Sequence, residues 1–134
     1  MNNFGFFRGI NSEHSGDFTN SASFSLGNAL DSTGFYKIDS FFSSYIQDTN
    51  GSLNIDLGGT TAGDNYDQLV VDRNVTLAGT LNVNFVDGFN PGIGDSFVII
   101  DPVRSIFGTF ENVNLPALEA GKNGVMLVAI IVLE

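Results

Sequence analysis

The chain contains no cysteine, so it can form neither a disulfide nor a thiolate metal site. It has no tryptophan to stack on a sugar ring and a single histidine, His14, which excludes a metal site built from several histidines. Basic residues are also scarce, since 5 Lys and Arg stand against 15 Asp and Glu and give a formal charge of -10. This deficit argues against nucleic acid and anionic membrane surfaces as partners.

Long hydrophobic runs are absent as well. A membrane-spanning helix needs roughly 20 apolar residues, and the longest uncharged apolar stretch, residues 125–133, has the length of a strand. No membrane span is therefore expected. The first residues lack both a basic segment and a long apolar core, so no signal peptide is expected in this chain.

Helical periodicity is hard to find, whereas turn signals recur throughout the chain. Short apolar and aromatic stretches between these turns predict about ten strands. We expect one all-β domain over residues 1–134, with a Phe/Ser/Asn-rich part at residues 1–44 and a repeat-like part at residues 45–134. Charged residues make up only 15% of the chain, and Asn, Ser, Thr and Gly provide most of its polarity. This composition is typical of turn-rich β proteins, including secreted and surface proteins.

Two segments of the chain follow the same pattern. Residues 51–57 and residues 79–85 each begin with Gly and a small hydroxyl residue, and then alternate apolar residues with Asn or Asp. In a strand, alternation places Leu53, Ile55 and Leu57 on one face. Two similar strands at a fixed spacing favour stacked β structure. The prediction is a short right-handed parallel β-helix or solenoid, with a β-sandwich or jelly roll as the alternative.

Two further apolar segments are predicted to be strands. Residues 97–100 form a continuous apolar run, which indicates a strand buried on both faces. Residues 125–133 are predicted to form the last strand. If it is an exposed edge, such a strand is adhesive, so it is either covered or used for assembly.

About half of the chain resembles a repeat-like C-terminal region of large bacterial exported proteins. These include autotransporter-type passenger domains, β-helix surface proteins and proteins with C-terminal sorting signals. The resemblance rests on these segments: residues 51–71, residues 77–89, Pro91, residues 94–97, residues 108–110 and residues 115–118. It implies a parallel β-helix, export to the extracellular space or cell surface, and a structural or adhesive role. It implies no catalytic residue, and residues 1–44 match no part of it.

One segment presents oxygen-bearing side chains at alternate positions. These are Asp48, Asn50, Ser52, Asn54 and Asp56, and alternating oxygens are the arrangement with which a loop wraps a Ca²⁺ ion. The glycine and the final glutamate of an EF-hand loop are missing from their usual positions. The competing interpretation is a turn followed by a strand with an Asn/Asp face. Calcium is the one cofactor that the sequence suggests.

Other motifs favour structural interpretations. Asp64, Asp67 and Asp72 are acidic residues expected in a solvated loop, unless Asp67 and Gln68 bind backbone amides. His14 is expected to be solvated. The Gly-rich loop at residues 58–63 lacks the lysine and helix of a phosphate-binding loop and is expected to be a turn.

These observations predict a non-enzymatic structural or adhesive module of a bacterial exported or surface protein. The expected partners are other copies of the chain, or neighbouring modules of a surface protein. The alternative function is a carbohydrate- or calcium-binding β module with a glycan as its partner. An enzyme acting on polysaccharide is a third interpretation, because paired carboxylates can cleave glycosides. No pair is singled out among the 15 acidic residues.

Overall fold

The computed structural model describes most of the middle of the chain and parts of both ends. The described residues are 2–3, 6–9, 12–14, 16–26, 35–38, 44–61, 65–92, 95, 97–102 and 104–116. For residues 2–14 and 35–38 only the backbone is considered. Within these residues the structure contains fourteen strands and no helix, which confirms the all-β prediction.

The strands form three sheets, here called A, B and C. The strands of sheet A are, in spatial order, β1 (Asn2–Asn3), β4 (Phe18–Asn20), β7 (Tyr45–Gln47), β10 (Asn74–Leu77) and β13 (Ser105–Gly108). Those of sheet B are β2 (Phe6–Gly9), β5 (Ser23–Leu26), β8 (Ser52–Leu57), β11 (Thr80–Phe85) and β14 (Asn112–Asn114). Those of sheet C are β3 (Ser12–His14), β6 (Phe35–Ile38), β9 (Gln68–Val71) and β12 (Ile100–Pro102).

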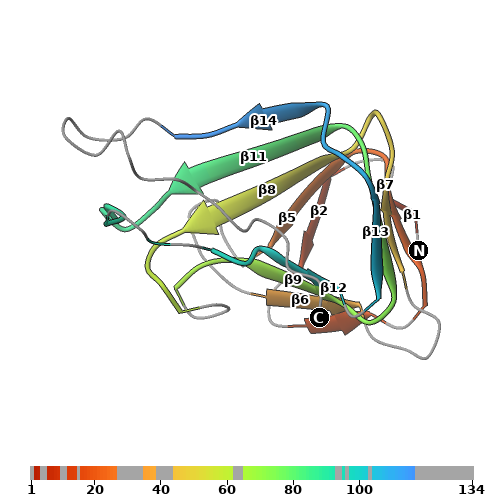
Figure 1. Ribbon diagram of the computed structural model, residues 1–134, viewed down its shortest axis with the longest axis horizontal. Coiled ribbons are helices and arrows are strands. Elements are labelled where there is room, and N and C mark those ends of the chain that lie inside the picture. Colours follow the sequence, from red (N-terminus) through yellow and green to blue (C-terminus); the bar gives the residue numbers. More distant parts are fainter. Residues whose placement is uncertain are drawn as a thin grey trace.

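All pairings between these strands are parallel. Consecutive strands never pair with each other, because the chain passes from sheet A to sheet B to sheet C before it returns to sheet A. Figure 1 shows the three sheets lying on three sides of a common interior. A β-sandwich or jelly roll pairs its strands antiparallel, so the parallel pairing disfavours the alternative fold raised by the sequence.

The core lies between the three sheets and is filled by alternate side chains of their strands. In β8, Leu53, Ile55 and Leu57 are buried, whereas the residues between them are half-buried on the outer face. The predicted shared face of these three residues is therefore confirmed. One apolar cluster contains residues from all three sheets, including Val75 from sheet A and Leu69 from sheet C.

The two similar segments of the sequence lie side by side. β8 and β11 pair over six residues, from Ser52 with Thr80 to Leu57 with Phe85. Matching residue types therefore stack in rows across sheet B, with apolar residues on apolar residues and asparagine on asparagine. In one such row Phe24, Leu53 and Leu81 are buried in the core. We call it the apolar row, and by register it runs through Phe7, Phe24, Leu53, Leu81 and Val113.

The predictions for the two further apolar segments have different outcomes. Within residues 97–100, the predicted burial is confirmed for Phe97, Ile99 and Ile100, whereas Val98 is half-buried. The predicted strand is wrong for residues 97–99, because β12 begins only at Ile100. The Val98 amide donates its hydrogen bond to the hydroxyl oxygen of Tyr66 and not to a neighbouring strand. The Tyr66 ring packs edge-on against Phe97, with 5.3 Å between the ring centroids. Residues 125–133 lie outside the described residues.

Candidate functional site

The outer face of sheet B is the most regular polar surface in the described part of the chain. Its side chains are half-buried or exposed and alternate with buried apolar residues, so small polar groups stack in rows across the sheet. We call this surface the outer polar face. Its residues are Ser23, Ser25, Ser52, Asn54, Asp56, Thr80, Asn82, Asn84, Asn112 and Asn114.

Three asparagines form a hydrogen-bonded column across this face. The Nδ2 atom of Asn114 donates to Oδ1 of Asn82 at 2.8 Å, and Nδ2 of Asn82 donates to Oδ1 of Asn54 at 2.9 Å. The column ends on sheet B's serines, because Nδ2 of Asn54 donates to Oγ of Ser23 and Oγ of Ser25. All three amides thus point the same way along the stack. Each amide has two donor hydrogens and two acceptor lone pairs, so capacity to bind an external ligand remains.

The five residues predicted to bind calcium fall into two groups. Asp48 and Asn50 lie in the turn before β8, where Oδ1 of Asp48 accepts a hydrogen bond from the Asn50 amide and Oδ2 accepts one from the Ser21 hydroxyl. Ser52, Asn54 and Asp56 lie on the strand itself and belong to the outer polar face. The structure therefore has the turn and the Asn/Asp-faced strand of the competing interpretation.

Strand geometry limits what these residues can hold together. Alternate residues of a strand are about 6.6 Å apart, so Ser52 and Asp56 are separated by about 13 Å, whereas Ca²⁺ binds its oxygen ligands at about 2.4 Å. A single ion cannot contact both residues. The described residues also contain no group of three or more His, Asp or Glu that could hold a metal ion.

Asp67 is a buried carboxylate with a structural role. It is fully buried, and its Oδ2 accepts a hydrogen bond from the Asp56 amide at 2.8 Å. The neighbouring Gln68 donates from Nε2 to the Val98 carbonyl at 3.0 Å. The expectation that Asp67 binds a backbone amide is confirmed, whereas Gln68 instead binds a carbonyl oxygen. Asp64 lies outside the described residues, as does the side chain of His14.

The structure also contains a buried amide network, which the sequence did not predict. Asn20 at the end of β4 and Gln47 at the end of β7 are both buried and share one row. Nδ2 of Asn20 donates to the Ser52 carbonyl at 3.0 Å. Nε2 of Gln47 donates to the carbonyls of Ala78 and Thr80 at 2.9 and 3.0 Å. Each amide thus binds the backbone where the following part of the chain turns from sheet A into sheet B.

Tyr45 completes this network. Its hydroxyl donates to Oε1 of Gln47 at 2.7 Å and accepts from Nδ2 of Asn20 at 3.2 Å. Burial raises the pKa of the Tyr45 hydroxyl above its ordinary value, and the hydrogen bond from Asn20 opposes this only in part. The sequence contained one signal of the network: Gln47 and Asn20 each lie two residues after a core aromatic residue, and so on the core-facing side of their strands.

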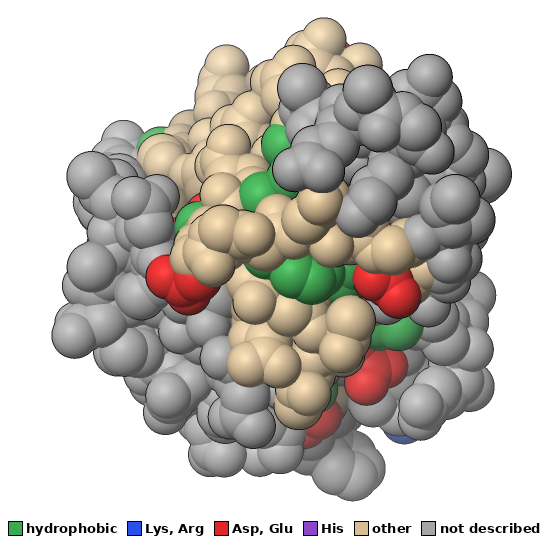
Figure 2. All heavy atoms as spheres, turned by 90° about the vertical axis from the view of Figure 1, so that its left-hand side faces the viewer, with side chains coloured by type: hydrophobic (Ala, Val, Ile, Leu, Met, Phe, Trp, Pro, Cys, Tyr) green, Lys and Arg blue, Asp and Glu red, His purple; other side chains and the backbone are tan. Residues whose placement is uncertain are grey.

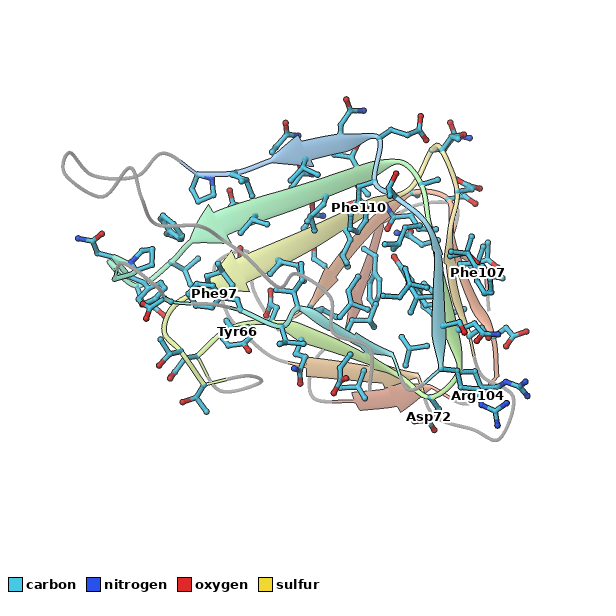
Figure 3. The ribbon with its side chains drawn as sticks, in the orientation of Figure 1. Tyr66, Asp72, Phe97, Arg104, Phe107 and Phe110 are labelled. Atoms are coloured by element: carbon cyan, nitrogen blue, oxygen red, sulfur yellow. The ribbon has the colours of Figure 1, made fainter. Side chains whose placement is uncertain are left out.

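The C-terminal edge of sheets A and B exposes large apolar side chains. Four such residues are exposed in the described part of the chain, and three of them lie in or beside β13 and β14: Phe107 at 55%, Val113 at 45% and Leu115 at 51%. Figure 3 shows Phe107 on the outside of sheet A and Phe110 on its inner side. Among the described strands, β13 and β14 have a neighbour on one side only, so this edge resembles the surface of an incomplete stack.

A different side of the molecule is acidic. Figure 2 views the side toward which β8 and β11 run, and shows Asp and Glu side chains around a small apolar area, with little Lys or Arg. The Gly-rich loop after β8 begins on this side. A Cβ atom on Gly59 would lie 2.6 Å from Cβ of Asn65, so Gly59 is required for the close approach of two loop segments. This supports the prediction of a turn for residues 58–61, whereas residues 62 and 63 lie outside the described residues.

Comparison with protein-family models, curated proteins and solved structures finds no match for this chain. The resemblance to bacterial exported proteins therefore stays a prediction. Within the described residues, no helix has the length and apolar character required to cross a bilayer.

Proposed function

We propose that this chain is a short right-handed parallel β-helix that serves as a non-enzymatic structural or adhesive module of a bacterial exported or surface protein. The observation that carries the proposal is the regular order of the strands. The chain visits sheets A, B and C in turn, and each strand pairs in parallel with the strand three places along the chain. A coil of stacked turns produces this order, and each turn buries its apolar face only against its neighbours.

The end of this stack supports association with another β module. The three exposed apolar residues of the C-terminal edge accompany strands that are unpaired on one side among the described residues. Exposed strand edges readily pair with other chains. The role proposed here is therefore to pair with copies of the same chain or with neighbouring modules.

The geometry supports an enzymatic function less well. A glycoside hydrolase needs two carboxyl groups facing the bond that is cleaved. In the described part of the chain, Asp67 is the only buried carboxylate, and its Oδ2 binds the Asp56 amide. The structural proposal accounts for this residue without a substrate.

Self-association can be tested with two variants that share one row of sheet A. Phe107→Lys places a charge on the terminal strand β13, whereas Ile46→Lys places one on the internal strand β7, in the row Thr19, Ile46, Thr76 and Phe107. We expect light scattering with size-exclusion chromatography to show oligomers for the unchanged chain and for Ile46→Lys, and monomers for Phe107→Lys. An unchanged chain that stays monomeric at about 1 mM, where even weak complexes form, would refute self-association.

The outer polar face favours a second candidate function, the binding of an extended carbohydrate. The supporting observation is the asparagine column, which offers amide groups at the spacing of the strands, about 4.8 Å. If this face binds a glycan, Asn82→Leu should weaken the affinity about fivefold or more, because each lost hydrogen bond contributes about 1 kcal/mol. Calorimetry with a glycan panel and with Ca²⁺ tests this candidate. The absence of any binding heat with both the glycans and Ca²⁺ would refute this candidate function.

A further inference from the structure

We infer that the partner of the C-terminal edge is a second copy of this chain, stacked head to tail. In this arrangement β13 and β14 of one copy pair in parallel with β1 and β2 of the next copy. The inference rests on the proposed function and deepens it by naming the partner, its orientation and the strands in contact. It follows from strand direction, from the apolar row and from the asparagine column.

Strand direction makes the two ends of the stack complementary. Among the described strands, the outermost ones are β1 and β13 in sheet A and β2 and β14 in sheet B. Because every strand within a sheet runs the same way, a copy displaced along the stack continues both sheets with parallel pairing. A two-fold pairing of one end with itself would instead place the strands antiparallel. A head-to-tail contact leaves an edge free at each end, so it generates chains of copies rather than closed dimers.

The last residue of the apolar row of sheet B is partly exposed to solvent. Leu53 and Leu81 are 0% exposed, whereas Val113, the next residue of the same row, is 45% exposed. By its register, Val113 therefore occupies a core-facing position, and within the described part of sheet B it has a neighbouring strand on one side only. At the opposite end the row begins with Phe7 of β2. A second copy would place the backbone of β2 beside β14 and would bury Val113 as its own sheet buries Leu81.

The asparagine column also ends with a hydrogen-bond acceptor that is unused in the described structure. Oδ1 of Asn54 and Oδ1 of Asn82 each accept a hydrogen bond from the next asparagine, but Oδ1 of Asn114 accepts none in the described structure. The direction of the column thus leaves an acceptor at the end formed by β14. In the inferred contact, the position beside Asn114 is Arg8 of the following copy. Arginine carries hydrogen-bond donors and no acceptor, so its chemistry matches this acceptor.

Sheet C does not share this complementarity. Its terminal strand β12 contains Asp101, whose row begins at Glu13 of β3, so stacked copies would bring two acidic positions together. β12 also contains Pro102, which lacks an amide hydrogen and is a common residue of protected edges. The inferred contact is therefore confined to sheets A and B.

Disulfide cross-linking tests the inferred orientation, and the absence of cysteine from the chain leaves a clean background. Arg8 and Asn114 occupy the two ends of one row, Arg8, Ser25, Asn54, Asn82 and Asn114. Four strand spacings of about 4.8 Å separate them by about 19 Å within one copy, and a disulfide requires Cα atoms within about 7 Å. In a head-to-tail contact the two positions are neighbours.

The double variant Arg8→Cys/Asn114→Cys is expected to form a ladder of dimers, trimers and longer products under mild oxidation, and reduction should remove the ladder. The pair Asn2→Cys/Phe107→Cys tests sheet A in the same way, since these residues begin and end one row. The matched control is Arg8→Cys/Asn54→Cys, because Asn54 lies inside the sheet and should give no ladder. Circular dichroism of the reduced proteins establishes that each variant is folded.

The outcomes separate the inference from the proposed function. Dimers formed by Asn114→Cys alone would show a two-fold contact and would overturn the head-to-tail inference while leaving self-association intact. An unchanged chain that forms oligomers without a ladder from either folded double variant would also overturn the inference alone. An unchanged chain that is monomeric, with no ladder, would overturn both. A ladder from the double variants, with monomers from each single variant, supports the inference.

Discussion

Replacing Gly79 with alanine is expected to lower the free energy of unfolding by about 2 to 5 kcal/mol, because the change adds backbone strain to a steric clash. Gly79 has a φ angle of +65°, a conformation that residues with a Cβ atom rarely adopt. An added Cβ would overlap the Gly51 carbonyl oxygen and would lie 2.7 Å from the Asp48 carbonyl oxygen. Both obstacles are backbone atoms, so no side chain can rotate away.

The surroundings of Gly79 explain why the clash cannot be relieved. The Gly51 carbonyl oxygen accepts hydrogen bonds from the Thr80 amide at 3.0 Å and from Nε2 of Gln47 at 3.2 Å. Moving this carbonyl away from Gly79 would weaken both bonds. The carbonyl of Gly79 in turn accepts from the amides of Glu111 and Asn112. The strain would therefore spread to the corners before and after it.

Gly88→Ala is the matched control for this prediction. Gly88 has a φ angle of +69°, close to that of Gly79, but nothing lies within 4 Å of the position that an added Cβ atom would take. Gly88→Ala therefore isolates the conformational cost of placing a residue with a Cβ atom in the left-handed region, which is about 1 kcal/mol. Urea unfolding followed by circular dichroism measures both variants. Equal losses for Gly79→Ala and Gly88→Ala would contradict the steric argument.

The segments that begin at Gly51 and Gly79 show which features of the fold could be predicted from the sequence. The similarity of residues 51–57 and 79–85 predicted stacked strands, and β8 and β11 do pair in register. The alternation of Leu53, Ile55 and Leu57 with polar residues predicted the core-facing positions, because side chains of a strand alternate between its two faces. The closeness of the Gly79 and Gly51 corners could not be predicted in this way. It depends on the separation of backbone atoms that meet only after the strands have paired.

The buried amides were missed for a different reason. Asn and Gln are mostly exposed in proteins, so the amides of Asn20 and Gln47 were not assigned to the core. Their carbonyl partners belong to residues far along the chain, such as Ser52 and Thr80. The outer polar face, by contrast, follows directly from alternation. Its Asn column required the register of three strands, of which the similar segments supplied only two.

Gln47→Leu is expected to lower the free energy of unfolding by about 2 to 4 kcal/mol, because several buried groups lose their partners. Nε2 of Gln47 binds the carbonyls of Gly51, Ala78 and Thr80, and its Oε1 accepts the Tyr45 hydroxyl. Leucine has a similar size and removes every one of these bonds.

The shape of leucine is not expected to be the cause of the loss. Extending the register of β7 and β10 by one residue places Leu77 next to Gln47, and Leu77 is buried at 5% exposure. Asn82→Leu provides the matched control, because it also converts an amide into leucine but does so on the outer polar face. Its former partners can bind water there, so the free energy of unfolding is expected to fall by less than about 1 kcal/mol. Comparable losses for Gln47→Leu and Asn82→Leu in urea unfolding would contradict the role assigned to burial.

A double-mutant cycle with Tyr45→Phe separates the hydrogen bonds from the packing. In the unchanged chain, Tyr45→Phe removes the donor to Oε1 of Gln47 and the acceptor of an Asn20 amide hydrogen. In the Gln47→Leu background the Tyr45 hydroxyl has already lost its acceptor, so removing it should cost less, by about 1 kcal/mol or more. The coupling arises because a buried donor without an acceptor is destabilising, whereas a buried ring without a hydroxyl is not. Additive losses would show that Tyr45 and Gln47 stabilise the corner independently, through their packing alone.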